Sequence, residues 1–275
     1  MNTERDYVLG THDGEMGRLA LQHRVWRPRA LDAWRRAGFT VGRTLLDAGC
    51  GPGHATLDLA EIVGPTGRIM AVDQSHRFLD TLEAACRRRG IDHVETAELD
   101  LDEQSLPHLE VDGAWCRWVL SFVRKPREVL GKIVGAVRPG GAIVLHEYID
   151  YSTWRLAPRC PEVEEFVAAV MASWRAEGGE PDIALELPCW LEGLGLKIRS
   201  IRPIVDVVPP SIYVWQWPAR FLEVGVHRLV ELGHLAAGRA AAITRAFARR
   251  EADGQTHMIT PTVLEIIAVK DGTRA

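Results

Sequence analysis

The sequence predicts an α/β fold in which a mostly parallel sheet is covered by helices on both faces and carries a helical cap. Strand-like and helix-like segments alternate from about residue 44 to residue 147, which is typical of a parallel sheet. A glycine-rich turn, Gly49-Cys50-Gly51-Pro52-Gly53, follows the first apolar segment. After Tyr148 the alternation stops and longer amphipathic helices begin, which predicts a separate helical layer.

The elements of the core follow one another in a regular order. A helix is expected from Ala55 to Val63, and Ser75 is a suitable N-cap for the next helix. Pro126 stands at the favoured first position of a third helix. The expected core strands are 41–46, 69–72, 94–99, 111–119 and 142–145, followed much later by 197–205 and 258–270.

Two regions of the chain lie outside this alternation and together predict the cap. We expect a helix over 161–176, a second over 187–194 and a mostly helical stretch over 211–251. The resulting division of the chain is an N-terminal helical cap segment (1–40), the cofactor-binding core (41–150), cap helices with the sixth strand (151–205), a helical insertion of the cap (206–257) and the last strand of the core sheet (258–275).

Composition excludes several classes of function. The net charge of −4 gives no support for a nucleic-acid partner, which requires a basic face. No apolar run approaches the roughly 20 residues of a membrane span, and the N-terminus lacks an apolar leader segment. The five cysteines show no C-x-x-C spacing, so neither a metal site nor a disulfide framework is expected. We therefore expect a cytoplasmic protein without a metal, nucleic-acid or membrane partner.

The glycine turn distinguishes two classes of cofactor-binding protein. Dinucleotide-binding proteins use G-x-G-x-x-G after a strand, but His54 stands where this pattern requires its third glycine. Asp47, Gly49, Gly51 and Gly53 instead match the signature D-x-G-x-G-x-G without a mismatch. Asp73 ends the next strand, where an acid suits the ribose hydroxyls of either cofactor.

This signature and the order of elements resemble the class I S-adenosylmethionine-dependent methyltransferases of the UbiE-like small-molecule type. The resemblance covers about residues 40–148 well and the remainder only in outline. It implies a Rossmann-like, seven-stranded, mostly parallel sheet whose last strand is antiparallel and lies beside the sixth. It also implies S-adenosyl-L-methionine as the cofactor.

The resemblance assigns roles to residues that follow the strands. It implies that Asp73 holds the ribose, that Gln74 flanks the adenine, and that Asp100 and Leu101 contact the adenine. Arg117 would face the cofactor and the substrate, and Arg18 or Gln22 would reach the cofactor carboxylate from an N-terminal helix. The turn residues that the resemblance places around the methionine part are Asp47, Gly49, Cys50, Gly51 and Gly53.

The substrate side is predicted from position and residue type. His146 leaves the fifth strand at the end where a base would be needed, and histidine titrates near neutral pH. An ordinary hydrogen-bonded histidine beneath the cap is the alternative. Glu147 would orient His146, bind a substrate amine or cap a turn. The expected substrate-binding residues at the start of the cap are Tyr148, Tyr151, Trp154 and Arg175, because aromatic walls bury flat or apolar ligands.

The sequence thus predicts methyl transfer to an O, N or C atom of a small, partly aromatic or apolar metabolite. A NAD-type oxidoreductase and a non-catalytic S-adenosylmethionine-binding regulatory protein are the alternatives. Methylation of RNA or protein is disfavoured by the mild negative charge. The apolar pattern of the cap helices permits a homodimer but is equally consistent with packing inside one chain.

Overall fold

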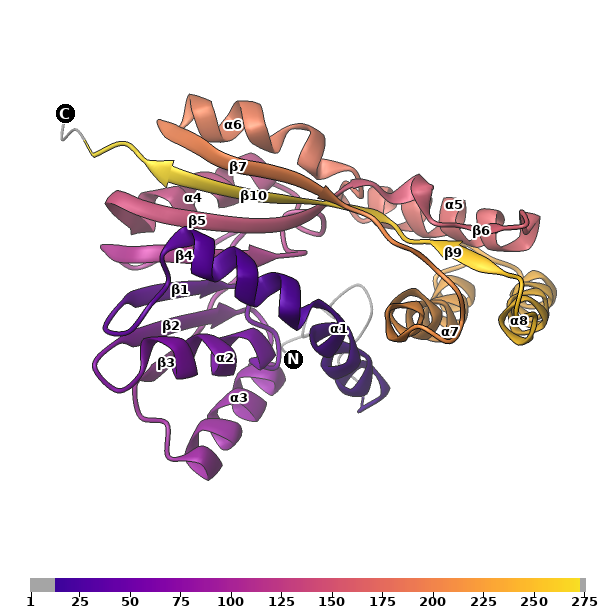
Figure 1. The fold of residues 1–275 in the computed structure, drawn as a ribbon, viewed down its shortest axis with the longest axis horizontal. Helices are drawn as coiled ribbons and strands as arrows, with labels where there is room; N and C mark the ends of the chain where they lie inside the picture. Colours follow the sequence, from indigo (N-terminus) through magenta and orange to yellow (C-terminus); the bar gives the residue numbers. More distant parts are fainter. Residues whose placement is uncertain (1–12, 273–275) are drawn as a thin grey trace.

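Seven strands form the central sheet of the computed structural model, which describes residues 13–272 (Figure 1). Their spatial order is β3-β2-β1-β4-β5-β10-β7, and β10 runs antiparallel to both of its neighbours whereas the other pairs are parallel. The strands are β1 (Thr44–Ala48), β2 (Arg68–Asp73), β3 (Val94–Glu98), β4 (Val111–Arg117), β5 (Val137–Asp150), β7 (Leu196–Ile204) and β10 (Thr262–Lys270). The predicted fold class, with an antiparallel last strand beside the sixth, is confirmed.

Helices cover both faces of this sheet because successive strand residues point to opposite faces. Leu45 packs with α2 and the second half of α1, whereas Leu46 packs with α4 and α6. The helices of the core are α1 (Asp13–Ala37), α2 (His54–Val63), α3 (His76–Arg89), α4 (Pro126–Ala136) and α6 (Leu187–Gly193). The expected N-cap is present, since Ser75 Oγ accepts from the N–H of Phe78 at 3.4 Å.

A second layer forms the cap at one end of the sheet (Figure 1). It contains the helices α5 (Pro161–Ala176), α7 (Gln216–Glu231) and α8 (Ala237–Ala252) and a small sheet of β6 (Arg155–Ala157), β9 (His257–Ile259) and β8 (Val207–Val208). The apolar faces of α5 and α7 are buried inside this layer around Phe166 and Trp154. The pattern that permitted a homodimer is therefore accounted for by packing within one chain.

Several boundaries differ from the prediction. The segment 206–257 is not entirely helical, because β8 and part of β9 lie within it. The expected last strand is divided into β9 and β10 around Pro261, which has no N–H to continue a ladder. The fifth strand is also longer than expected and continues to Asp150, because β10 pairs with it along Ala142–Asp150.

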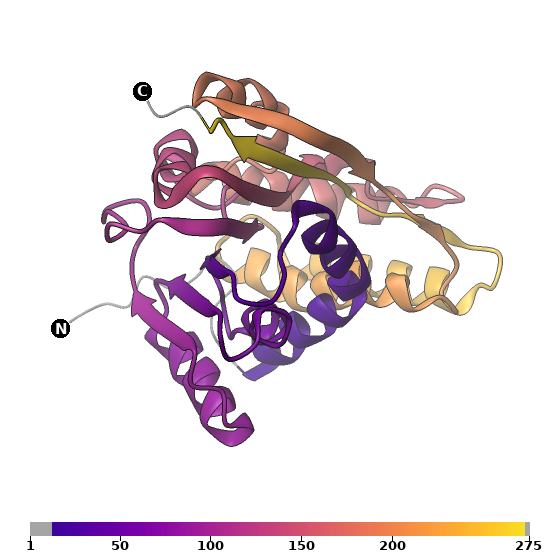
Figure 2. The ribbon, with the colours of Figure 1, turned by 60° about the vertical axis from the view of Figure 1, so that its left-hand side comes forward.

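Helix α1 connects the two layers. Trp26, in its middle, packs edge-on against Trp217 of the cap with ring centroids 4.9 Å apart. Trp34, two turns later, packs against Trp115 of the sheet at 5.1 Å. The expected cap segment 1–40 therefore includes a helix whose second half belongs to the core, while residues 1–12 lie outside the described part of the chain. Figure 2 shows α1 lying beside both the sheet and the cap helices.

Candidate functional site

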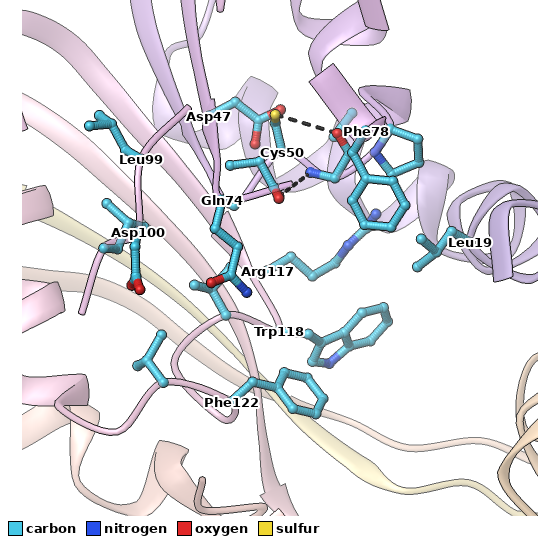
Figure 3. Close-up of a pocket in the computed structure, with 18 of the residues that line it drawn as sticks. Leu19, Asp47, Cys50, Gln74, Phe78, Leu99, Asp100, Arg117, Trp118 and Phe122 are labelled. Atoms are coloured by element: carbon cyan, nitrogen blue, oxygen red, sulfur yellow. Dashed lines mark hydrogen bonds between the residues drawn. The ribbon is translucent and has the colours of Figure 1, made fainter. Parts of the chain in front are cut away.

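A cavity of about 610 Å³ opens at the carboxyl ends of the first four parallel strands. This is the usual ligand position in an open α/β sheet, and the size suits a small-molecule ligand. The glycine turn, Asp73 with Gln74, and the Leu99–Asp102 segment line one side. Leu19 of α1 lies across the hollow from Asp100 and Gln74 in Figure 3.

The glycine turn shapes the floor of the cavity. Gly49 has φ +71°, and a Cβ there would lie 2.2 Å from Cγ2 of Val119, so only glycine fits. Gly51 has φ +55°, and no atom lies within 4 Å of the position its Cβ would take. Its N–H donates to Oδ2 of Asp73 at 2.8 Å, which ties the turn to the end of β2. The turn thus leaves open space where a ligand can approach the backbone.

Carboxylates are spaced along the cavity. Asp47 is buried and accepts from the Thr56 hydroxyl at 2.6 Å, and burial raises the pKa of Asp47 to about 6. Asp73 Oδ1 accepts from the N–H of Ser75 at 2.9 Å, and burial also raises the pKa of Asp73. Asp100 and the buried Leu101 follow β3 at the other end. The structure therefore brings the acids that follow three strands into one cavity.

A polar cluster closes the cavity beside Asp47, and most of it was not predicted. Arg117 Nη2 lies 3.3 Å from His23 Nδ1, and His23 Nε2 lies 3.0 Å from Asp58 Oδ2. The ring of His54 stacks on His23 with centroids 5.8 Å apart. Burial lowers the pKa of His54 to about 4 and that of Arg117 to about 10. At neutral pH the cluster holds neutral imidazoles beside a charged guanidinium.

An aromatic wall forms the side of the cavity that faces the cap. Trp118 adopts φ +52°, the only positive φ of a non-glycine residue in the described chain, and such strain often marks a functional site. Its ring stacks on Trp217 at 5.6 Å, and Phe122 packs on Trp174 at 4.6 Å. Trp118, Phe122 and Leu19 line the cavity. Sequence reasoning missed this wall, because its position depends on the turn after β4.

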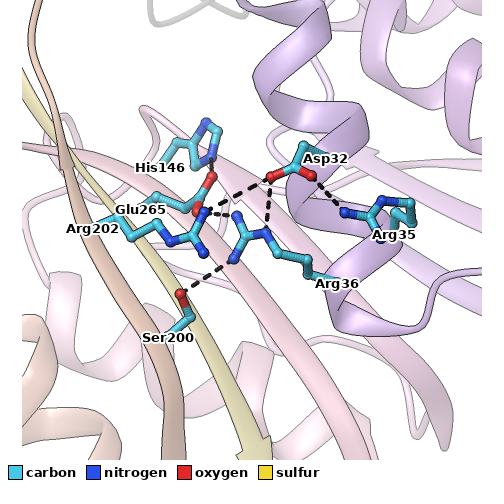
Figure 4. A network of polar contacts seen from close by, with 7 residues as sticks. All are labelled: Asp32, Arg35, Arg36, His146, Ser200, Arg202 and Glu265. Carbon is cyan, nitrogen blue, oxygen red and sulfur yellow. Dashed lines mark hydrogen bonds and ion pairs between the residues drawn. The ribbon is translucent and has the colours of Figure 1, made fainter.

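The expected catalytic residues lie outside the cavity. His146 is fully buried, with its Nε2 3.2 Å from Oε2 of Glu265 and its ring between Trp26 and Trp115. Burial lowers the pKa of His146. Figure 4 shows His146 in a polar network with Glu265 and Arg36. The structure does not support the prediction that His146 is the base, because its ring packs against Trp26 and Trp115 and it does not line the cavity, which is the alternative of an ordinary hydrogen-bonded histidine.

Glu147 is a structural carboxylate. Its Oε1 accepts from the N–H groups of Val119 and Leu120 at 2.8 and 2.9 Å, and its Oε2 accepts from the Ser121 hydroxyl at 2.8 Å. Burial raises the pKa of Glu147 to about 7, although the hydrogen bonds from these donors act to lower it. The side chain thus fixes the segment that presents the aromatic wall and does not itself line the cavity, which is the turn-capping alternative and not the expected catalytic role.

The expected substrate-binding residues do not line the cavity either. Tyr148, Tyr151 and Trp154 are buried in the aromatic core of the cap. Arg175 is exposed on α5 and pairs with Glu180 at 2.7 Å and with Asp182 at 3.1 Å. Aromatic residues in this part of the chain are buried in the cap and do not line the cavity, because the cap has a hydrophobic core of its own.

The remaining predicted cofactor residues divide into two groups. Gln22 lines the cavity, whereas Arg18 lies behind it, paired with Glu15 and donating to Gln22 Oε1 at 2.7 Å. Gly53 caps α2 with φ 83° and does not line the cavity. The predicted residues that do line it are Asp47, Gly49, Cys50, Gly51, Asp73, Gln74, Asp100, Leu101, Arg117 and Gln22.

The described residues contain no cluster of three or more side chains suited to a metal ion. Within the same residues, none of the helices is both long and apolar enough to cross a membrane.

Comparison with known proteins agrees with this geometry. Residues 46–145 match the family described as "Methyltransferase domain". The demethylmenaquinone methyltransferase of Lactococcus lactis is 28% identical over 126 residues, which cover 46% of this chain and 49% of that protein. The chain therefore spans about half the length of the curated relatives of this kind that it matches.

Solved structures show the same fold at low sequence identity. One is geranyl diphosphate C-methyltransferase from Streptomyces coelicolor A3(2), solved with S-adenosyl-L-homocysteine (TM-score 0.59, 17% identity, 90% of this chain and 77% of that chain covered). Another is the [4+2]-cyclase SpnF (TM-score 0.56, 18% identity, 90% and 82% covered). These two similarities concern the fold of the chain.

Proposed function

The chain carries a class I S-adenosylmethionine-dependent methyltransferase domain, and we propose on that premise that it transfers the cofactor's methyl group to a small, flat or apolar metabolite. The observation that carries the proposal is a single cavity with acids along one side and the aromatic wall on the other. The acids suit a cationic nucleoside, and the wall suits an acceptor with an apolar surface. The acceptor atom is an O, N or C atom.

The cavity residues fit the cofactor in order. The carboxylate oxygens of Asp73 accept from the backbone N–H groups of Gly51 and Ser75, and a carboxylate has enough lone pairs to accept from a ribose hydroxyl as well. Asp100, Leu101 and Gln74 would hold the adenine, and the open space over Gly51 would admit the methionine part. When bound, S-adenosylmethionine supplies the activated methyl group. The protein's task is then to align the acceptor and exclude water.

The aromatic wall would position the acceptor. Trp118 is held by stacking on Tyr148 at 5.4 Å and on Trp217 at 5.6 Å, so its ring is a rigid surface. Leu19 of α1 and Phe122 complete an apolar boundary, with Arg124 and Glu177 also lining the cavity. Because His146 and Glu147 are enclosed elsewhere, we propose that alignment against this wall, and not a base from β5, is the main contribution of the protein.

Isothermal titration calorimetry with S-adenosylmethionine, S-adenosylhomocysteine and NAD tests the cofactor. We expect binding of the first two and none of NAD. Release of S-adenosylhomocysteine during incubation with a panel of small aromatic and apolar acceptors then tests the transfer. Binding of NAD alone would favour an oxidoreductase. Cofactor binding without release for any acceptor, together with an effect of the cofactor on a partner, would favour a regulatory protein.

We also propose that the protein works in the reducing cytoplasm. All five cysteines are free, and four of them are buried. Free buried cysteines are typical of a reducing compartment.

A further inference from the structure

Arg117 is a half-buried cation that forms no ion pair with a carboxylate among the described residues. Its Nη1 has no hydrogen-bond partner and is inaccessible to solvent, Nη2 is hydrogen-bonded to the neutral ring of His23, and the guanidinium lies over the rings of Trp115 and Trp118. The nearby acid, Asp47, is bonded to the Thr56 hydroxyl. A buried charge without a counterion is costly. The guanidinium lines the cavity, so an anionic group of a ligand would offset that cost.

The orientation of Arg117 is fixed by a chain of side chains from two helices. A guanidinium can only donate, so Nδ1 of His23 must accept and its proton must be on Nε2. That N–H then donates to Asp58 Oδ2 at 3.0 Å, and Arg27 also donates to this oxygen at 2.8 Å. Asp58 belongs to α2, and His23 and Arg27 belong to α1. Helix α1 therefore holds the guanidinium through a neutral histidine.

A second buried nitrogen atom without a partner lies at the same end of the cavity. Nε2 of His54 is inaccessible to solvent and has no partner among the described residues. The ring stacks on His23, which keeps it beside the cluster, and it lines the cavity with Arg117. Nη1 of Arg117 can only donate, and Nε2 of His54 donates in the tautomer that carries its proton there, so this end of the cavity suits an acceptor group better than an apolar one.

We propose that Arg117 and His54 bind the amino-acid carboxylate of the cofactor, and that His23 and Asp58 are positioning residues that orient Arg117. The proposal rests on S-adenosylmethionine being the ligand. A planar carboxylate matches the fork of a guanidinium. The polar cluster adjoins the glycine turn, and the acids for the nucleoside lie farther along the cavity, so the amino-acid end of the cofactor faces Arg117. Helix α1 is thereby part of the cofactor site.

The test compares S-adenosylmethionine with decarboxylated S-adenosylmethionine, which keeps the sulfonium and the ammonium and lacks only the carboxylate. We expect the wild type to bind the decarboxylated form about 10- to 100-fold more weakly, the range for a charged hydrogen bond. Arg117→Met should weaken binding of S-adenosylmethionine by a similar factor and leave the decarboxylated form within about threefold of wild type. Calorimetry on the full chain gives both dissociation constants.

Variants of the positioning residue His23 are compared by the ratio of the dissociation constants of decarboxylated S-adenosylmethionine and S-adenosylmethionine. A purely structural role of His23 would not change this ratio. His23→Phe keeps a ring against His54 but removes both polar contacts, and should lower the preference for the carboxylate by about 3- to 10-fold. His23→Asn places an amide oxygen near the position of Nδ1 and should recover part of that preference. Arg87→Met is the matched control, because Arg87 is an exposed arginine of α3 that pairs with Glu83 and does not line the cavity. It should leave the ratio unchanged.

Three outcomes separate the inference from the proposed function. If the wild type binds neither nucleoside, the proposed function fails. If it binds both but Arg117→Met weakens them equally, the carboxylate is not held by Arg117 and the inference is overturned. If Arg117→Met leaves both affinities unchanged while weakening an acidic acceptor, the anion belongs to the acceptor and the inference is again overturned.

Discussion

Asp73 is the residue through which the glycine turn and the end of β2 act together. One of its oxygens accepts from Gly51 and the other from Ser75, so the carboxylate is held in one orientation before a ligand arrives. Preorganisation of this kind reduces the cost of ordering side chains on binding.

Asp73→Asn should weaken the binding of S-adenosylhomocysteine by about 10- to 100-fold, because the amide replaces one acceptor by a donor. Calorimetry measures the affinity, and circular dichroism verifies that the variant is folded. Glu98→Gln is the control, since Glu98 lies beside Asp73 on β3 but is exposed and outside the cavity. Equal effects of the two substitutions would contradict the role of Asp73.

His54 gives a prediction about acid stability. Burial lowers its pKa from 6.5 to about 4. Between these values the unfolded chain binds more protons than the folded chain, so the contribution of His54 to stability is complete above pH 6.5 and is lost as the pH falls toward 4. Between pH 6.5 and 4.5 we expect the wild type to lose about 1–2 kcal/mol more than His54→Gln in its free energy of unfolding.

Urea unfolding of the cofactor-free protein at several pH values measures this difference. His76→Gln, at an exposed position on α3, is the comparison and should follow the wild type. A wild-type curve parallel to that of His54→Gln over this pH range would show that His54 is accessible to protons in the folded state.

At the scale of elements, the order of strands could be predicted because buried parallel strands and amphipathic helices have distinct periods. The acids after β1, β2 and β3 could be placed in the site for the same reason, since strand ends share one edge of the sheet. His146 could not be placed. Its surroundings depend on β10, which pairs Glu265 opposite it from 119 residues away.

The polar cluster and the aromatic wall were missed for a related physical reason. His23 and Asp58 meet across 35 residues of sequence, and no local pattern predicts such a contact. His54 was visible only as a mismatch to the dinucleotide pattern. Trp118 adopts a positive φ directly before two residues, Val119 and Leu120, whose backbone N–H groups donate to Glu147 from 28 and 27 residues away.

The pairing of β10 with β5 leads to a prediction about Glu265. This buried carboxylate accepts from Arg36 and contacts His146. Glu265→Gln should destabilise the protein by about 1–3 kcal/mol, because it removes the buried carboxylate partner of Arg36 and leaves that guanidinium with Asp32 alone as its carboxylate partner among the described residues. Its dissociation constant for S-adenosylhomocysteine should remain within about threefold of wild type, since the network lies outside the cavity.

Chemical denaturation measures the stability of this variant. Glu95→Gln breaks an exposed pair with Arg68 and should change stability by less than about 1 kcal/mol. A large loss of cofactor affinity in Glu265→Gln, without loss of stability, would show that this network contributes to cofactor binding.

At the scale of the whole molecule, α1 makes the cap and the sheet one cooperative unit. Trp26 belongs to the cap core and Trp34 to the sheet core, and both are fully buried. Neither layer can lose its structure without exposing one half of this helix.

We therefore expect tryptophan fluorescence and far-ultraviolet circular dichroism to report one coincident unfolding transition in urea. S-adenosylhomocysteine at one hundred times its dissociation constant should add about 2.7 kcal/mol to the free energy of unfolding. The increase in the free energy of unfolding should be the same when it is measured by fluorescence and by circular dichroism. Two separated transitions, with the ligand moving only one of them, would show that the layers unfold independently.

The strands β7 and β10 lead from the sheet to β8 and β9 of the small sheet, so two lengths of chain cross side by side between the layers. A paired, hydrogen-bonded connection resists bending far more than a single linker does. An enzyme that admits its reactants by swinging one domain away from another needs a hinge, and this connection stiffens the place where a hinge would be. Reactants should therefore enter and leave through local movements around Leu19 and Phe122, with the cap remaining in place during turnover.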